Sequence, residues 1–288
     1  MQRLVCGLMA VWLVCSAAAV SALEPDWRPR SVERFAQDAE VVDGAWLEGI
    51  GGYVSGGTVA STAVDPITDS DTTRIADVDD IGIAAVRLAA GWKFLEMGLT
   101  VPVYWIEGSD VAVEGADDIR GEKEKGIGDA AFYAKVVPIQ TSFFNLGGGV
   151  LLSAPTGDSD KGLGAGELGF QPFVTASLQH QWFQLRGHAG YHTYRDTNDV
   201  AAEGPLYGVG LFFTPNYYLG VRAELIGERY DRPGPSAPWR FEPGIDIRFL
   251  FPEVDMILRP TGMIGLNKAA PDWGILTSLV FTRSVYWD

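Results

Sequence analysis

Hydrophobic and polar residues alternate along most of the chain from Gly44 onward. In the segment 167–179 every even position is apolar, whereas the odd positions are mostly polar or small. A β-strand points successive side chains to opposite faces of its sheet, so this segment predicts a strand with one apolar and one polar face. The same alternation, with its phase shifted, runs through 183–194 and 239–249. We therefore expect an all-β fold.

About twelve segments carry this pattern, and most of them are about 11–14 residues long. Strands of globular proteins usually have about 5–6 residues, whereas a tilted strand that crosses a membrane needs about 9–11. The lengths therefore favour membrane-spanning strands. We place these strands at 44–54, 81–91, 93–105, 126–138, 143–154, 166–179, 182–195, 205–214, 217–229, 239–250, 254–266 and 272–286.

The connections between these segments alternate between short turns and longer links, as in outer-membrane barrels with short periplasmic turns and longer outer loops. An even number of strands would place both chain ends on the periplasmic side. The short turns lie near Gly91-Trp92, Ile139–Ser142, His180-Gln181, Thr214–Asn216 and Phe251–Glu253. The longer links lie at 55–80, 106–125, 155–165, 196–204 and 230–238, with a modest one at 267–271.

Tryptophan and tyrosine gather at the ends of the segments, as Trp46 and Trp182 do. Their apolar rings and polar tips suit the membrane–water interface. The last segment, 272–286, keeps its large apolar residues in one phase and resembles the terminal strand that the barrel-assembly machinery recognises, so that machinery is an expected partner. Two features depart from this pattern, because Arg283 interrupts the apolar phase and Asp288 follows the final aromatic residue.

A soluble, secreted β-sandwich would also show alternation. Strand length, loop asymmetry, aromatic segment ends and an export signal favour a membrane protein instead. Lipid cannot satisfy the hydrogen-bonding groups of an open sheet edge, so strands at membrane depth must close into a barrel. The sequence therefore predicts a transmembrane antiparallel β-barrel of about twelve strands over 44–288.

The first 22 residues have the features of a signal peptide, which predicts export to the outer membrane of a Gram-negative cell. Arg3 supplies the positive charge, 4–14 is an apolar run, and Val20-Ser21-Ala22 is a small-residue cleavage site. Cleavage after Ala22 would remove both cysteines of the chain. Disulfides, zinc–thiolate sites and iron–sulfur clusters are therefore not expected in the mature protein.

The segment 23–43 precedes the first predicted strand as a short N-terminal extension. It contains two prolines and a stretch, 31–39, that could form two helical turns. We expect it to lie in the barrel as a plug or to remain a periplasmic tail, and the sequence does not separate these alternatives.

The chain is acidic, with a formal net charge of −15 over 288 residues. It lacks the basic surface of a nucleic-acid-binding protein, so we expect no nucleic-acid partner. Many of its acids fall in the longer links 55–80 and 106–125. Such runs are usually solvated surface, although divalent cations could bridge them to phosphates of lipopolysaccharide. An acidic vestibule would also disfavour anionic solutes.

The polar faces of the predicted strands would line the barrel with charges of both signs. Neighbours of opposite sign on adjacent strands can pair, so these charges could brace a narrow barrel, form a selective constriction, or do both. The candidate lumen-lining residues are Asp129, Lys135, Glu167, Arg186, His188, Arg222, Glu224, Arg240, Glu242, Asp246, Arg248 and Arg259. Further charges in the predicted lumen include Lys93, Glu96, Glu228 and Asp255.

The three histidines give little support for a metal site or an enzyme. His188 and His192 share one face of a strand, but four residues of strand separate them by about 13 Å, which is too far for a common ion. No G-x-S-x-G sequence is present, and no serine is close to these histidines in the chain. We therefore expect no bound metal, no cofactor and no catalytic residues, with an outer-membrane lipid hydrolase as a remote alternative.

Two short motifs stand out, Gly126-Ile127-Gly128-Asp129 at the start of a strand and Pro155-Thr156-Gly157-Asp158 after the next one. Proline ends a strand and the following residues suit a turn, while Gly128 suits a kink. These residues therefore define the fold locally or, alternatively, contact a ligand. The motif residues are Gly126, Gly128, Asp129, Pro155, Thr156, Gly157 and Asp158.

This pair of motifs resembles the MetA-pathway-of-phenol-degradation family of "transporter" outer-membrane proteins, which are distantly like long-chain fatty-acid and aromatic-hydrocarbon channels. The likeness is sharpest over 126–172 and extends over the rest of the barrel by pattern alone. It implies an outer-membrane channel for passive uptake of small, hydrophobic or aromatic molecules. A plugged barrel that serves membrane integrity or adhesion is the alternative function.

Overall fold

The computed structural model describes residues 39, 41, 44–56, 58–64, 71–108, 123–158, 163–164, 168–193, 204–229, 237–251, 254–268 and 270–284. The expected signal peptide over 1–22 and Glu167 lie outside the described residues. The same holds for the extension over 23–43, apart from Ala39 and Val41, which are both buried.

Fourteen strands make up the described secondary structure, and the described residues contain no helix that is long and apolar enough to span a membrane. The strands are β1 (Gly44–Ser55), β2 (Thr58–Val64), β3 (Asp71–Trp92), β4 (Leu95–Gly108), β5 (Lys123–Ile127), β6 (Ala130–Gln140), β7 (Phe144–Ala154), β8 (Gly169–His180), β9 (Phe183–His192), β10 (Gly204–Asn216), β11 (Leu219–Glu228), β12 (Trp239–Leu250), β13 (Asp255–Gly265) and β14 (Trp273–Ser284).

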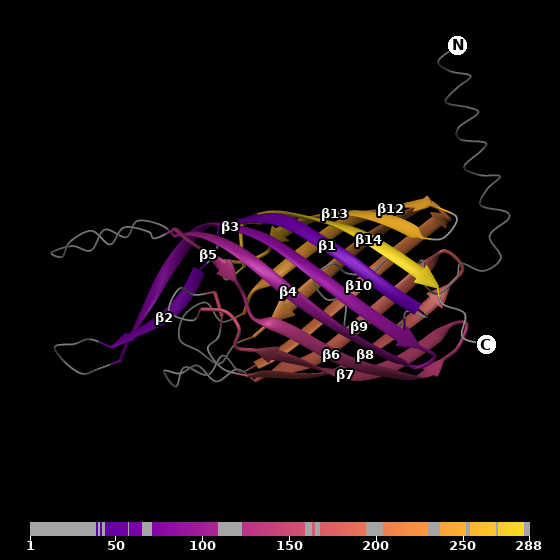
Figure 1. Ribbon diagram of the computed structural model, residues 1–288, viewed down its shortest axis with the longest axis horizontal. Helices are drawn as coiled ribbons and strands as arrows, with labels where there is room; N and C mark the ends of the chain where they lie inside the picture. The colour runs from indigo at the N-terminus through magenta and orange to yellow at the C-terminus, as the bar shows by residue number, and fades with distance from the viewer. Residues whose placement is uncertain are drawn as a thin grey trace, which may run out of the picture.

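Twelve of these strands close into a barrel in which every neighbouring pair is antiparallel (Figure 1). The first strand, β1, pairs with β14 on one side and with β3 on the other, so the ring has no open edge. The remaining two strands, β2 and β5, are not members of the ring. β2 pairs only with the outer part of β3, and β5 continues in line with β6 along β4. The predicted antiparallel barrel of about twelve strands is confirmed, and the sandwich alternative is excluded.

The outer part of the barrel differs from the sequence-based expectation. The segment 55–80 was expected as a loop, but β2 and the first half of β3 form a hairpin in which Thr58 pairs with Asp77 and Val64 with Asp71. Figure 1 shows this hairpin projecting beyond the barrel at the end opposite to the start of β1. Its residues are small and polar or β-branched, so they suit strand geometry without the two-faced pattern of a membrane wall.

The two ends of the barrel differ in their connections. At one end, here called the short-turn end, pairs of residues such as Lys93-Phe94 and Gln181-Trp182 join adjacent strands. Lys93 and Gln181 have positive φ values of 54° and 48°, which tight two-residue hairpins require. The opposite end, here called the long-loop end, carries the hairpin and the longer links. Gly44 pairs with Ser284, so the first and last strands begin and end together at the short-turn end.

The wall is apolar outside and largely polar inside. Along β8 the burial alternates strictly at its start, so that Gln171 and Thr175 are buried while Phe170 and Val174 are exposed. Side chains as large as Leu88 remain about half exposed on the outside, at 51%. An apolar outer surface of this extent is stable only against lipid, which is what membrane-spanning strands require.

Candidate functional site

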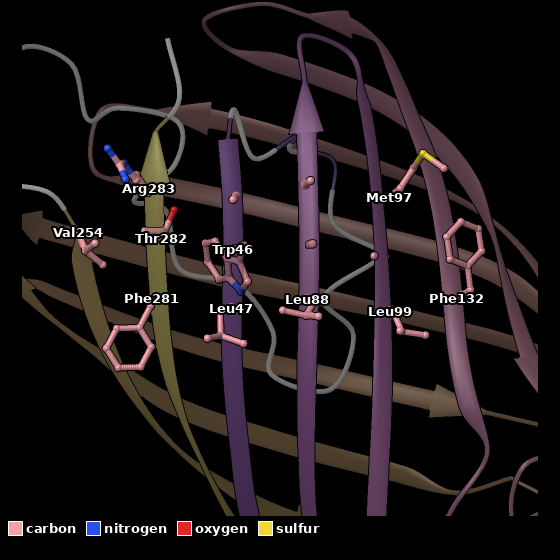
Figure 2. Close-up of a pocket in the computed structure, with 14 residues that line it drawn as sticks. Trp46, Leu47, Leu88, Met97, Leu99, Phe132, Val254, Phe281, Thr282 and Arg283 are labelled. Carbon is pink, nitrogen blue, oxygen red and sulfur yellow. The ribbon is translucent and has the colours of Figure 1, made fainter. Parts of the chain in front are cut away.

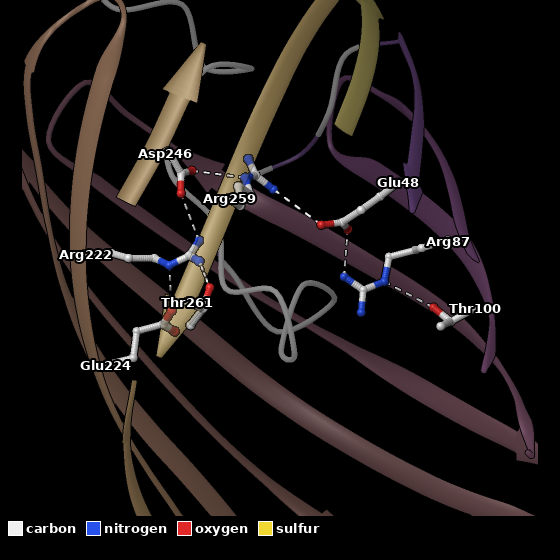
Figure 3. Close-up of polar contacts among 8 residues, drawn as sticks. All are labelled: Glu48, Arg87, Thr100, Arg222, Glu224, Asp246, Arg259 and Thr261. Atoms are coloured by element: carbon white, nitrogen blue, oxygen red, sulfur yellow. Dashed lines mark hydrogen bonds and ion pairs between the residues drawn. The ribbon is translucent and has the colours of Figure 1, made fainter. Parts of the chain in front are cut away.

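The inner wall carries a layer of buried ion pairs at about mid-height, here called the ion-pair layer (Figure 3). Its centre is Arg259 on β13, which is fully buried. Arg259 Nε lies 3.0 Å from Asp246 Oδ2 on β12, and Arg259 Nη1 lies 3.9 Å from Glu48 Oε1 on β1. The guanidinium also lies over the ring of Trp46, 4.9 Å from its centroid. Arg259 therefore links strands on both sides of β14.

The layer extends from Asp246 to β11. Arg222 donates a hydrogen bond of 3.0 Å from Nη1 to Asp246 Oδ1, and its Nε lies 3.9 Å from Glu224 Oε1. The Arg222 guanidinium also bonds the Thr261 hydroxyl of β13. Gly244 on β12 pairs with Arg222 in register, and a methyl group at Gly244 would lie 2.8 Å from Arg222 Nη2. The missing side chain at Gly244 therefore leaves the space that the guanidinium fills.

On its other side the layer extends from Glu48 to β3 and β4. Arg87 donates a 3.0 Å hydrogen bond from Nη1 to Glu48 Oε2 and a 3.2 Å bond from Nε to Thr100 Oγ1. Sequence reasoning missed Glu48 and Arg87 as candidates. The alternation in β1 marks Glu48 as an inward residue. The second half of β3, where Arg87 lies, is apolar on both faces, so its pattern does not say which way Arg87 points.

A second buried pair lies on the neighbouring wall. Lys135 on β6 is 3.2 Å from Glu96 on β4, and the Tyr133 hydroxyl donates a 2.8 Å hydrogen bond to the same carboxylate. The Tyr133 ring lies flat against Gly98, where a methyl group would be 2.6 Å from Tyr133 Cζ. Two residues of β6, Lys135 and Tyr133, therefore hold the Glu96 carboxylate of β4 in a fixed position.

The other predicted lumen residues sit above and below these groups. Arg240 contacts Glu242 at 2.8 Å and Glu228 at 3.4 Å, near the long-loop end. Arg248 pairs with Asp255 near the short-turn end. The remaining groups are Arg186 and His188. Arg186 lies 4.2 Å from the centroid of the Phe212 ring, and its Nε donates a 2.7 Å hydrogen bond to Gln184 Oε1. The His188 ring lies against Gly208.

Acids and bases are nearly balanced inside. The buried charged side chains of the described residues comprise Glu48, Glu96, Glu224, Glu228, Glu242 and Asp246 against Arg87, Lys135, Arg186, Arg222, Arg240, Arg248 and Arg259. A buried charge is costly without a partner of opposite sign, which accounts for the balance. The net charge of −15 is therefore not concentrated on the inner wall.

Lys93 departs from the expectation that it lies in the lumen. It occupies the exposed turn between β3 and β4, and its ammonium group lies 4.6 Å from the centroid of the Trp92 ring. A two-residue turn directs its first side chain away from the sheet interior, whereas the alternation pattern assumes a continuous strand.

Among the described residues, no group of three His, Cys, Asp or Glu side chains is arranged to hold a metal ion.

An apolar patch, unexpected from the sequence, lies inside the barrel above the ion-pair layer. Val54, Met263 and Leu276 are each at most 6% exposed, and Ile50, Ile81 and Ile83 pack against them. These side chains come from β1, β3, β13 and β14, near the long-loop end. On these four strands the inner wall is therefore apolar toward the long-loop end and carries ion pairs at mid-height, whereas β11 and β12 carry the Arg240 ion pairs at the long-loop end.

The two sequence motifs contact each other at the long-loop end. The Gly157 amide donates a 2.9 Å hydrogen bond to Asp129 Oδ1, and the Thr156 hydroxyl bonds both the Gly128 carbonyl, at 2.9 Å, and the Ala130 amide, at 2.8 Å. Gly128 itself donates to the Pro102 carbonyl at 2.9 Å, at the break between β5 and β6. The motifs thus form a latch that fastens the loop after β7 to this break. Pro155 and Asp158 lie exposed in the same loop. Gly126 lies against the Leu163 side chain, since a methyl group at Gly126 would be 2.8 Å from Leu163 Cδ1.

No protein-family model and no curated protein sequence matches this chain. Solved structures do match. The crystal structure of the COG4313 outer membrane channel from Pseudomonas putida F1 aligns with a TM-score of 0.55 and 12% identity, over 91% of this chain and 99% of that one. The NanC porin aligns with a TM-score of 0.49 and 9% identity, over 83% and 100% of the two chains.

The Pseudomonas putida toluene transporter TodX aligns with a TM-score of 0.43 and 8% identity, over 90% of this chain and 96% of that one. At these identities the likeness concerns the fold. The assignment of the fold rests on the first of the three structures, because its alignment covers nearly the whole of both chains. This chain has the fold of an outer-membrane β-barrel, as the motif resemblance implied.

Proposed function

We propose that this protein is an outer-membrane channel for the passive uptake of small, hydrophobic or aromatic molecules, and that it is not an enzyme. The closed barrel with an apolar outer wall supports a membrane location. The structural neighbours include proteins described as an outer membrane channel and a toluene transporter, which supports the same class of activity. Lipopolysaccharide around the outer loops and the barrel-assembly machinery at the last strand are the partners that we expect.

The observation that carries the proposal is the amphipathic inner wall. A hydrophobic solute entering at the long-loop end along β1, β3, β13 and β14 meets apolar side chains, including Val54, Met263 and Leu276. The buried ion pairs of Arg240 lie beside this path, on β11 and β12. Apolar pockets with few polar groups are the usual sites for such solutes. The balanced ion pairs below offer no strong field that would select an ion of one sign.

Planar-bilayer conductance of the refolded mature chain, beside a chain that lacks 23–42, tests the proposal. Discrete steps from the mature chain are expected. Toluene should reduce their conductance, and Met263→Gln should weaken this block several-fold because it places an amide in the apolar patch. Met256→Gln, on the outer face of β13, is the matched control. Equal block of both variants would contradict a lumenal site for the solute.

A plugged or structural barrel is the second candidate, and the ion-pair layer favours it. Side chains such as Arg222 and Arg259 are buried as fully as a protein core. Replacing Arg240 and Arg248 by alanine separates the two functions. A channel predicts altered permeability with the barrel intact, whereas a brace predicts lower heat resistance without a change in flux. Silence from both the mature and the shortened chain in the bilayer would also favour the structural function.

A further inference from the structure

A groove of about 490 Å³ lies on the outer wall at the short-turn end, across β14, β1, β3, β4 and β6 (Figure 2). It faces lipid rather than the lumen, so the proposed channel function does not use it. Its exposed lining side chains are almost entirely hydrocarbon, with Arg283 at one edge. The same arginine is the residue that interrupts the apolar phase of the last strand.

Strand register explains why the wall is hollow here. One cross-strand row consists of Arg283, Ala45, Ala90 and Met97, since Ala45 pairs with both Arg283 and Ala90, and Ala90 pairs with Met97. Two methyl groups therefore lie between two long side chains. Adjacent strands are about 4.8 Å apart, so the two long side chains are separated by about 14 Å at the backbone.

The next row toward the middle of the barrel is built entirely of large side chains. Register pairs Leu47 with Phe281 and with Leu88, and pairs Leu99 with Leu88 and with Phe132. Figure 2 shows these five side chains as a ridge along one side of the groove. The alanine row thus forms a trough that is closed on its membrane-core side by the ridge and open toward the interface.

An arginine in the lipid-facing phase needs a partner for its charge. The long side chain can place its guanidinium at the interface while its methylenes stay in the apolar region. Guanidinium groups bind phosphate through two parallel hydrogen bonds, and phosphate is the anion that a membrane offers at this depth. A hydrocarbon trough beside an interfacial guanidinium fits the two chemical parts of a phospholipid.

We infer that this groove is a binding site for one glycerophospholipid of the leaflet at the short-turn end. The lipid phosphate binds Arg283, and one acyl chain lies in the trough over Ala45 and Ala90, against the ridge formed by Leu47 and Leu88. The site spans the seam between β1 and β14, so the bound lipid covers the junction of the first and last strands.

Native mass spectrometry of the full mature protein in detergent, titrated with dimyristoyl phosphatidylglycerol, tests this inference. The wild-type protein is expected to retain one lipid more tightly than any further ones. Arg283→Gln should weaken this first binding about tenfold, whereas Arg229→Gln, an exposed arginine at the long-loop end, should not. Retention of the first lipid by the Arg283 variant at wild-type strength would overturn the phosphate contact.

The trough is tested separately by filling it. Ala90→Phe should remove the first binding step, while Ala189→Phe adds the same ring to the outer face of β9, away from the groove. Equal loss in both variants would show ordinary lipid coating of the barrel and overturn the site. A protein dimer that Ala90→Phe abolishes would instead identify a second copy of the chain as the occupant, which also overturns the inference. Both phenylalanine variants must still show the heat-dependent gel shift of a folded barrel.

Discussion

Some glycines in the barrel wall leave space for an aromatic ring to pack directly against the backbone. Tyr133 covers Gly98 in this way, and His188 covers Gly208. A side chain at such a glycine would lift the ring from the wall and break the contacts behind it. The abundance of glycine, 35 of 288 residues, therefore reflects packing inside the barrel as well as turns.

Gly98→Ala should destabilise the barrel by about 1–3 kcal/mol, because overpacked sites carry costs of this size. The new methyl group would lie 2.6 Å from Tyr133 Cζ and 2.8 Å from the Leu88 carbonyl oxygen. Tyr133 would have to move, and its hydrogen bond to Glu96 would lengthen. Equilibrium unfolding in urea, monitored by tryptophan fluorescence in vesicles, measures the change.

Gly49→Ala is the matched control for this prediction. Gly49 faces outward, and nothing lies within 4 Å of a methyl group placed there. The stability of the Gly49→Ala variant should equal or slightly exceed that of the wild type, because alanine restricts the unfolded chain more than glycine does. Similar losses of stability at both positions would show that position 98 needs glycine for its backbone conformation and not for the contact with the Tyr133 ring.

At the scale of elements, the latch explains how an interrupted strand stays in register. β5 and β6 both pair with β4, but Gly128 and Asp129 between them are not in strand conformation. The loop after β7 supplies the missing hydrogen bonds through Thr156 and Gly157. These contacts give the motif residues a fold-defining role, and no described contact requires a ligand there.

Asp129→Ala should loosen the loop after β7 without unfolding the barrel. The substitution leaves the Gly157 amide without its 2.9 Å acceptor. Trypsin cleavage at Lys161, which lies in this loop sequence, should become several-fold faster, while the heat-dependent gel shift remains. Asp272→Ala, which removes an exposed carboxylate at the long-loop end outside the latch, is the control. An unchanged cleavage rate in the Asp129 variant would argue against the latch.

At the scale of the whole molecule, the barrel must hold its first strand against its last. Backbone pairing of β1 with β14 closes the ring. The ion-pair layer adds to it, because Arg259 on β13 reaches past β14 to Glu48 on β1, and Glu48 continues to Arg87 on β3. Side chains from strands far apart in sequence thus brace the seam from inside.

Glu48→Gln should lower the stability of the folded barrel by about 3–5 kcal/mol, since it breaks the buried ion pair with Arg87 and removes one of the carboxylates beside Arg259. Arg259→Met should also destabilise, and the double variant should lose less than the two single losses combined, because the residues interact. The temperature of the gel shift on heating ranks the variants. Glu107→Gln, which breaks an exposed pair with Lys123, should leave the gel-shift temperature close to that of the wild type, because solvent screens exposed ion pairs. Strictly additive losses of stability for the Glu48 and Arg259 variants would contradict an interaction between these two residues across the β1–β14 seam.

The sequence by itself determined the strands and the two faces of the wall. Alternation with a period of two is a local property, so segments such as 239–250 match β12 residue for residue. It also placed Arg222, Asp246 and Arg259 among the inward candidates, because each lies in the polar phase of its own strand. The hairpin of β2 with β3 was missed, since its residues carry no two-faced pattern.

Only the tertiary structure decided which residues meet. The pairing of Arg259 with Glu48 depends on closure of the ring and on strand stagger, and neither can be read from one strand. The apolar patch inside and the groove outside arise in the same way, from rows of side chains on four or five strands. Such rows are set by register across the sheet, a non-local quantity, whereas the periodicity of a single segment reports only which face each residue takes.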